Sequence, residues 1–135
     1  MMALKSLVEG TASAPVLVLG APISFWGGID YLTGLIQDRS HPQNGKSIAG
    51  TCLVVSNIRG SGGTPGVLAD TLRRGCGPAA IVIGYPDINT MTGIVVANRL
   101  YGSVFPMLLA TPEQRAALVT GVRAVIDKDG SLALG

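Results

Sequence analysis

The sequence predicts a single α/β domain over residues 1–135, with helices packed over a partly parallel sheet. Its N-terminal half is rich in strands, and it continues as a β-α-β-α alternation and a C-terminal hairpin. Three observations lead to this prediction. Short β-branched runs dominate the first half, apolar runs alternate with capped helical segments in the second, and an Asp129-Gly130 turn lies near the end. No internal repeat or linker interrupts the chain, so we expect one compact unit.

Short apolar runs in the first half predict four strands. Gly10 and Pro15 separate the first two runs, and a Thr33-Gly34 turn precedes the third. The fourth run is the longest and is rich in β-branched residues. We therefore expect strands at 4–8, 16–19, 35–38 and 48–55.

Helix caps mark the second half. Thr64-Pro65 is typical of an N-cap followed by a first-turn proline, Asp87 is a candidate cap, and Thr111 begins a capping-box pattern. We expect helices at 64–74, 88–101 and 112–119, strands at 79–85 and 104–109, and a hairpin over 122–134. The segment 88–101 fits a strand equally well, because it contains Ile94-Val95-Val96.

Composition excludes several classes of protein. The chain is 47% hydrophobic with a net charge of +2, which excludes disorder. Two cysteines form no disulfide framework, and with one histidine they make a self-contained zinc site improbable. Ten basic against eight acidic residues create no basic field for nucleic acid.

The apolar runs are far shorter than the roughly 20 residues that a membrane span needs. No signal-peptide core is present, so we expect a cytoplasmic protein with reduced thiols and no membrane association. The charged share of 13% is about half the usual value of about 25%. We therefore expect part of the surface to be covered by another chain.

The most informative stretch runs from Ser56 to Gly66, between a predicted strand and a predicted helix, and it holds four glycines. Glycines let backbone amides approach a ligand, and a helix start adds N–H groups and partial positive charge. An anion there, a carboxylate or a phosphate, would have Arg59 as a further partner. The same environment would activate the hydroxyl of Ser61. A purely structural turn explains these residues as well, and neither a Walker A nor a dinucleotide pattern is present.

A second stretch, 23–42, holds the only tryptophan and the only histidine. Its structural interpretation makes Trp26 a core anchor, Asp30 a turn residue and His41 a loop histidine with a structural hydrogen bond. Cys52 is expected in the core and Cys76 at the surface, and neither has metal-ligand spacing. The adjacent arginines 73 and 74 suit the C-terminal end of a helix dipole.

Several blocks in this order resemble the small subunit, or swivel domain, of the aconitase X family. The resemblance extends from about residue 10 to residue 110, and the block 24–30 is its most specific part. The blocks are Ser24-Phe25-Trp26-Gly27-Gly28-Ile29-Asp30, Thr33-Gly34, Asp38-Arg39, His41-Pro42, Gly45-Lys46-Ser47-Ile48-Ala49-Gly50, Arg59-Gly60-Ser61, Gly77-Pro78-Ala79-Ala80-Ile81 and Gly93-Ile94-Val95-Val96-Ala97.

This resemblance implies a swivelling β/β/α fold and a hydro-lyase that removes water from a hydroxy acid. It also implies a large catalytic subunit that carries an iron or iron–sulfur centre, with no cofactor on this chain. Ser61 matches the serine that takes the α-proton in aconitase-type enzymes. The family usually continues with further Ser or Cys residues, whereas this chain has Gly62-Gly63-Thr64-Pro65, so Thr64 is the candidate replacement for one hydroxyl.

The residues expected at the site fall into three groups. Ser61 is the expected catalytic base. Those expected to bind substrate are Arg59, Gly60, Gly62, Gly63 and Thr64. Those expected at the subunit interface or near the site are Ser24, Phe25, Trp26, Gly27, Gly28, Asp30 and His41.

Two substrates are attached to the family, cis-3-hydroxy-L-proline and phosphomevalonate. We favour hydroxyproline, because the composition is rich in arginine and poor in lysine and shows no second basic cluster for a phosphate. A non-catalytic ligand-binding module of the same fold is the competing hypothesis, and the altered segment 62–65 is the feature that favours it.

Overall fold

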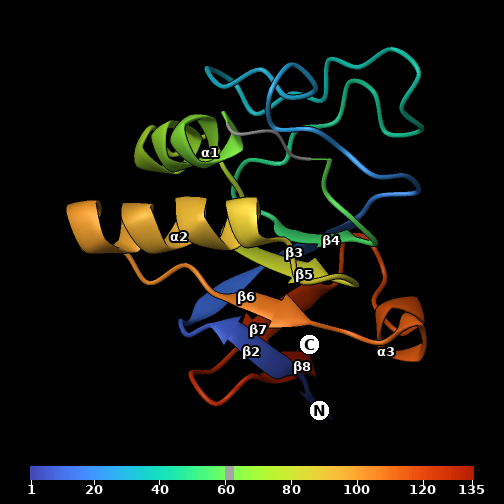
Figure 1. Cartoon of the computed structure of the whole chain (residues 1–135). Coiled ribbons are helices and arrows are strands. Elements are labelled where there is room, and N and C mark those ends of the chain that lie inside the picture. Colours follow the sequence, from blue (N-terminus) through green and yellow to red (C-terminus); the bar gives the residue numbers. More distant parts are fainter. Residues whose placement is uncertain (60–62) are drawn as a thin grey trace.

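Figure 1 shows the computed structural model, which describes residues 1–59 and 63–135. Its eight strands are β1 (Met2–Ala3), β2 (Lys5–Val8), β3 (Ala12–Val18), β4 (Cys52–Val55), β5 (Ala80–Ile83), β6 (Met107–Leu109), β7 (Arg123–Ile126) and β8 (Ser131–Leu134). Its helices are α1 (Thr64–Arg73), α2 (Ile88–Tyr101) and α3 (Pro112–Ala116).

The strands form one sheet in the order β1-β8-β7-β3-β4-β5-β6-β2. Strands β3 to β6 pair in parallel at its centre, and the flanking pairs are antiparallel. The two edge strands, β1 and β2, are separated in the chain by Leu4 alone. The sheet is therefore curled into a nearly closed form, because its two edges must lie one residue apart. The mixed α/β class and the strand-rich first half are as predicted.

The central strands are buried on both faces, as parallel strands usually are. Along β4, Cys52 and Val54 belong to the cluster inside the curled sheet, whereas Leu53 and Val55 belong to the cluster under the helices. This alternation follows from the two-residue period of a strand. In Figure 1, α2 lies against the sheet and α1 stacks on α2, with the long connection 19–51 beyond α1. No helix in the described part of the chain is long and apolar enough to cross a bilayer.

Local capping places two of the helices as predicted. Asp87 caps α2 by accepting hydrogen bonds from the Thr90 backbone N–H (2.9 Å) and hydroxyl (2.6 Å), and Gly102 ends the helix at φ +67°. The strand alternative for 88–101 is therefore wrong. The capping box at Thr111 is present, although α3 ends at Ala116 rather than at residue 119. The C-terminal hairpin of β7 and β8 is confirmed.

Several strand predictions are wrong or too long, including the one at 79–85, of which only Ala80–Ile83 forms a strand. Residues 35–38 make only single bridges, from Ile36 to Ile29 and from Leu35 to Ser47, so no ladder forms. The strand expected at 48–55 begins at Cys52, and the chain turns at Gly50 with φ +69°. Residues 104–106 stay outside β6, because the side-chain amide of Asn98 forms hydrogen bonds with both the backbone N–H and the carbonyl oxygen of Phe105.

Pro15 does not separate two strands but lies within β3, opposite Arg123 of β7. The next backbone N–H along β3, that of Val16, donates to Val122 on the β7 side. The nitrogen of Pro15 therefore faces the other edge of β3, where pairing with β4 starts only at Val16. A proline costs no ladder hydrogen bond at such a position.

Candidate functional site

The loop that follows β4 leaves the centre of the parallel sheet. Strand β4 lies between β3 and β5, and ligands of such sheets bind beyond the carboxyl ends of the strands. Ile58 forms a parallel bridge with Ile23, and the Arg59 backbone N–H donates to the Ile23 carbonyl oxygen at 2.8 Å. This pairing fixes the backbone of Arg59 and leaves its side chain exposed at the mouth of the loop.

The predicted base Ser61 and the predicted substrate-binding residues Gly60 and Gly62 lie outside the described residues. On the far side of the loop, Gly63 is the N-cap of α1, and its carbonyl oxygen accepts from the Val67 N–H at 3.2 Å. Thr64 is therefore the first helical residue, not the cap that the sequence suggested. It is fully buried.

The start of α1 is electropositive. The first turn contains no acidic residue, and the N-cap residue Gly63 has no side chain of its own to accept from the first helical N–H groups. The partial positive charge of the helix end is thus not offset within the helix, and Arg59 lies on the other side of the loop. Asp38 lies within reach of the Arg59 charge. Its pKa is lowered, mainly by the Ser40 hydroxyl that donates to it at 2.7 Å, and the charge of Arg59 lowers it further.

The segment beside the loop places two aromatic side chains in opposite environments. Phe25 is 1% exposed and belongs to the core, whereas Trp26 is 64% exposed. The expectation that Trp26 anchors the core is therefore wrong, because its neighbour Phe25 takes that place. Both residues lie in a tight turn, in which the Ser24 hydroxyl donates to the Trp26 carbonyl oxygen at 2.8 Å. The turn requires glycine at position 28, because a Cβ there would collide with the Ser24 carbonyl oxygen. Gly27 has a φ of +91°.

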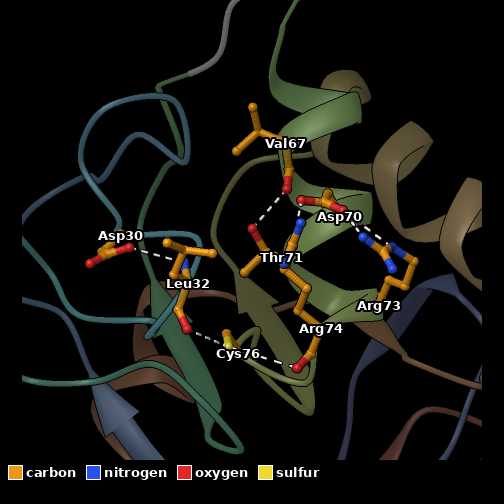
Figure 2. Close-up of polar contacts among 8 residues, drawn as sticks. All are labelled: Asp30, Leu32, Val67, Asp70, Thr71, Arg73, Arg74 and Cys76. Atoms are coloured by element: carbon orange, nitrogen blue, oxygen red, sulfur yellow. Dashed lines mark hydrogen bonds and ion pairs between the residues drawn. The ribbon is translucent and has the colours of Figure 1, made fainter.

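Asp30 and His41 have the structural contacts that the sequence suggested. The Asp30 carboxylate accepts from the Leu32 N–H at 2.9 Å, as Figure 2 shows. His41 is buried, and its Nδ1 accepts from the Gln43 N–H at 3.0 Å. Its proton must then be on Nε2, which donates to the Ala21 carbonyl oxygen at 3.0 Å. Both ring nitrogens are occupied by the backbone, so His41 has none left for a metal or a substrate.

The described residues do not fit an iron centre. They contain no group of three or more His, Cys, Asp or Glu side chains that could hold a metal ion. Cys52 is buried, which raises the pKa of its thiol to about 12 and keeps it protonated. The Cys76 thiol donates to the Leu32 carbonyl oxygen at 3.0 Å (Figure 2).

A cavity of about 840 Å³ lies between the 25–31 segment and α1. On the α1 wall, Asp70 binds Arg73 at 2.7 Å and Arg74 at 2.9 Å, as Figure 2 shows. The hydrogen bond from Arg74 is the main reason why the pKa of Asp70 is lowered. The Arg74 guanidinium also lies 5.8 Å from the centre of the Tyr31 ring.

Sequence reasoning missed this cavity. It assigned Arg73 and Arg74 to the helix dipole alone, although Asp70 stands three and four residues before them, a spacing typical of helical ion pairs. Tyr31 and Gln37 also line the cavity and carried no signal, because the turns of the 19–51 connection decide where they lie.

Comparison with known proteins agrees with this architecture. Residues 1–134 match the family described as the aconitase X swivel domain. The chain is 36% identical over 103 residues to the cis-3-hydroxy-L-proline dehydratase of Pseudomonas aeruginosa, covering 76% of this chain but 18% of that protein. It is 32% identical over 127 residues to the phosphomevalonate dehydratase small subunit of Thermococcus kodakarensis, covering 93% of this chain and 88% of that subunit.

A solved structure has the same fold. The crystal structure of Thermococcus kodakaraensis aconitase X in its holo-form superposes with a TM-score of 0.86 and 28% identity, covering 98% of this chain and 96% of that chain. This chain spans less than a fifth of the length of the hydroxyproline dehydratases that it matches. The swivel-domain match, by contrast, extends over nearly all of its residues, and the chain therefore belongs to the aconitase X swivel domain family.

Proposed function

We propose that this chain is the small subunit of an aconitase X-type dehydratase that removes water from cis-3-hydroxy-L-proline. The observation that carries the proposal is the swivel-domain match over residues 1–134, in a fold where residues 56–59 follow the carboxyl end of the central strand β4. The Pseudomonas aeruginosa relative, 36% identical, carries the name of this activity.

Ser61 is the base of the proposed reaction. Its alkoxide takes the proton α to the substrate carboxylate, so an O–H bond forms as the C–H bond breaks. The electron pair left on the α-carbon becomes the Cα=Cβ double bond as the hydroxyl departs from Cβ. A serine has a pKa far above 7, and only a positive environment makes this step feasible. The start of α1, which lacks a first-turn acid, and the exposed Arg59 supply that environment.

The substrate carboxylate gains charge as the α-proton leaves. We assign its binding to Arg59 and to the loop residues Gly60, Gly62, Gly63 and Thr64, because donors aimed at developing charge stabilise a transition state more than a ground state. The Arg59 backbone N–H donates to the Ile23 carbonyl oxygen, and this hydrogen bond fixes the backbone from which the guanidinium extends.

The rest of the site belongs, in this proposal, to a large subunit. Departure of the hydroxyl needs an acidic group, and the described residues offer neither a free imidazole nor a metal-ligand cluster for it. We therefore assign the iron centre to the large subunit.

Dehydration of phosphomevalonate is the second candidate. The extent of the match to the Thermococcus kodakarensis small subunit, 88% of its length, favours it. A phosphate would need further basic groups beside Arg59. Arg73, the last residue of α1, and Arg74, its C-cap, are both bound to Asp70, which favours the substrate without a phosphate.

Co-expression with the aconitase X large subunit of the same organism tests the proposal. The purified complex is assayed for water loss from each substrate. We expect turnover of cis-3-hydroxy-L-proline, and a fall of about 10²–10⁴-fold in Ser61→Ala, the range of a general base. Ser13→Ala, which removes an exposed hydroxyl on β3, is the matched control and should retain full turnover.

Three results would contradict parts of the proposal. Turnover of phosphomevalonate alone supports the second candidate. Normal activity in Ser61→Ala removes the base assignment. An assembled complex that dehydrates neither substrate indicates a non-catalytic module.

A further inference from the structure

The 840 Å³ cavity adjoins the end of the 56–66 loop that enters α1. Gly66 and Val67, in the first turn of α1, form part of one wall. The opposite wall begins at Phe25, two residues after Ile23, whose carbonyl oxygen accepts from the Arg59 backbone N–H near the start of the loop. Whatever covers the loop must therefore approach this cavity as well.

The side chains around the cavity are those that anchor protein–protein interfaces. Trp26 is 64% exposed, Tyr31 is 47% exposed, and Arg74 stacks over the Tyr31 ring. Tryptophan, tyrosine and arginine dominate the binding energy of interfaces, particularly where they surround a pocket. Because most of the Trp26 side chain is exposed in the free chain, a partner that covers it would bury a large apolar surface.

The backbone that carries Trp26 and the side chain of Arg74 are held in place before any partner arrives. The Ser24–Trp26 hydrogen bond fixes the turn that carries Trp26. Arg73 and Arg74 both form ion pairs with the Asp70 carboxylate, as Figure 2 shows. The pair with Asp70 restrains the Arg74 guanidinium in its position over the Tyr31 ring. An arrangement that is already ordered costs less entropy to bind.

We propose that this groove is the docking site of the aconitase X large subunit, with Trp26 as its main anchor and an apolar side chain of the large subunit seated between Trp26 and Tyr31. The inference rests on the proposed function, which places the rest of the active site on that subunit. The large subunit must then cover the loop, and its interface continues into the adjoining groove. The volume far exceeds that of a proline-sized acid, which fits a protein segment better than the substrate.

A second apolar surface provides the matched control. The outer face of α2 exposes Ile88, Val95 and Leu100, but this helix follows β5, not β4, and does not line the groove. Leu100 is 67% exposed, nearly the same as Trp26.

The experiment measures binding of the purified large subunit from the same organism. Because the chain has one tryptophan, 5-fluorotryptophan labelling gives a single ¹⁹F NMR signal that reports on position 26. We expect this signal to shift when the large subunit is added. By calorimetry, Kd should rise about 30-fold or more in Trp26→Ala and less than about 3-fold in Leu100→Ala.

An unshifted ¹⁹F signal at saturation, or wild-type affinity in Trp26→Ala, overturns the proposal. Loss of affinity only in Leu100→Ala assigns docking to α2 instead, and a dimer of this chain alone that Trp26→Ala dissociates assigns the groove to a second copy. None of these readouts uses a substrate. A complex that forms through Trp26 but dehydrates neither substrate would therefore refute the proposed function and leave the docking site intact.

Discussion

Replacement of Phe25 by alanine tests whether this residue, rather than Trp26, supports the fold beneath the site. Phe25 is 1% exposed and packs in the cluster between the sheet, the helices and the 19–51 connection. Truncation of a fully buried phenylalanine costs about 3–5 kcal/mol, because the transfer free energy is lost and a cavity is left. A domain of this size is stable by about 5–15 kcal/mol, so the variant should fold with a large loss of stability.

The adjacent Trp26→Ala is the comparison. Trp26 is 64% exposed, so folding covers about a third of a side chain of roughly 250 Å². At about 25 cal/mol per Å² this burial is worth at most about 2 kcal/mol, and the extended-chain reference makes that an upper bound. Trp26→Ala should therefore lose less than half of what Phe25→Ala loses.

Urea unfolding followed by circular dichroism measures both variants. With an m-value of about 2 kcal/mol/M, the midpoint should fall by about 1.5–2.5 M in Phe25→Ala and by less than about 1 M in Trp26→Ala. Phe25→Leu, which retains most of the volume, should lose less than about 1.5 kcal/mol and keeps the test interpretable if the alanine variant does not fold. An equal or larger loss in Trp26→Ala would refute the placement of these two rings.

Three further predictions follow from local contacts. Asp87→Ala should lower the free energy of unfolding by about 1–2 kcal/mol, because the cap of α2 at Thr90 is lost; an unchanged urea midpoint would contradict this. Iodoacetamide at pH 8 should label Cys76 and leave Cys52 unmodified until urea is added, because Cys52 is buried and its thiol has a pKa of about 12. Detection of two labels on the native protein by mass spectrometry would contradict this prediction. The pKa of Asp70 is lowered from 3.8 by its two arginines, so its contribution to stability is present above pH 3.8 and lost as pH falls through the lower folded-state pKa. Asp70→Asn should therefore flatten the fall of Tm below pH 4, whereas identical Tm–pH curves would show that the pairs contribute nothing.

The sequence predicted best the elements that are set by neighbouring residues. Helix α2 runs from the residue after Asp87 to the residue before Gly102, as its two caps require. The capping box at Thr111 and the Asp129-Gly130 hairpin are likewise contained within a few residues. Each of these signals is a hydrogen bond or a backbone conformation that needs no distant partner.

Predictions that depended on distant partners were less accurate. Residues 35–38 begin with the apolar pair Leu35-Ile36, but no strand pairs with them, and single bridges are all they make. Pro15 was expected to lie between two strands, and it lies inside β3 because pairing on one side begins one residue later. A strand exists only where a neighbour supplies the other half of its hydrogen bonds, and the chain itself does not say which neighbour that is.

The candidate site divides in the same way. The sequence by itself determined the family and the turn chemistry of Asp30. Its assignment of Arg59 and Ser61 to the site stays a prediction. Only the tertiary structure decided that Phe25 is buried while Trp26 is exposed. It also decided that the 25–31 segment faces α1 across a groove. The physical reason is that capping and turns are local interactions, whereas burial is a property of the whole packed chain, set when the sheet curls and the 19–51 connection closes over the helices.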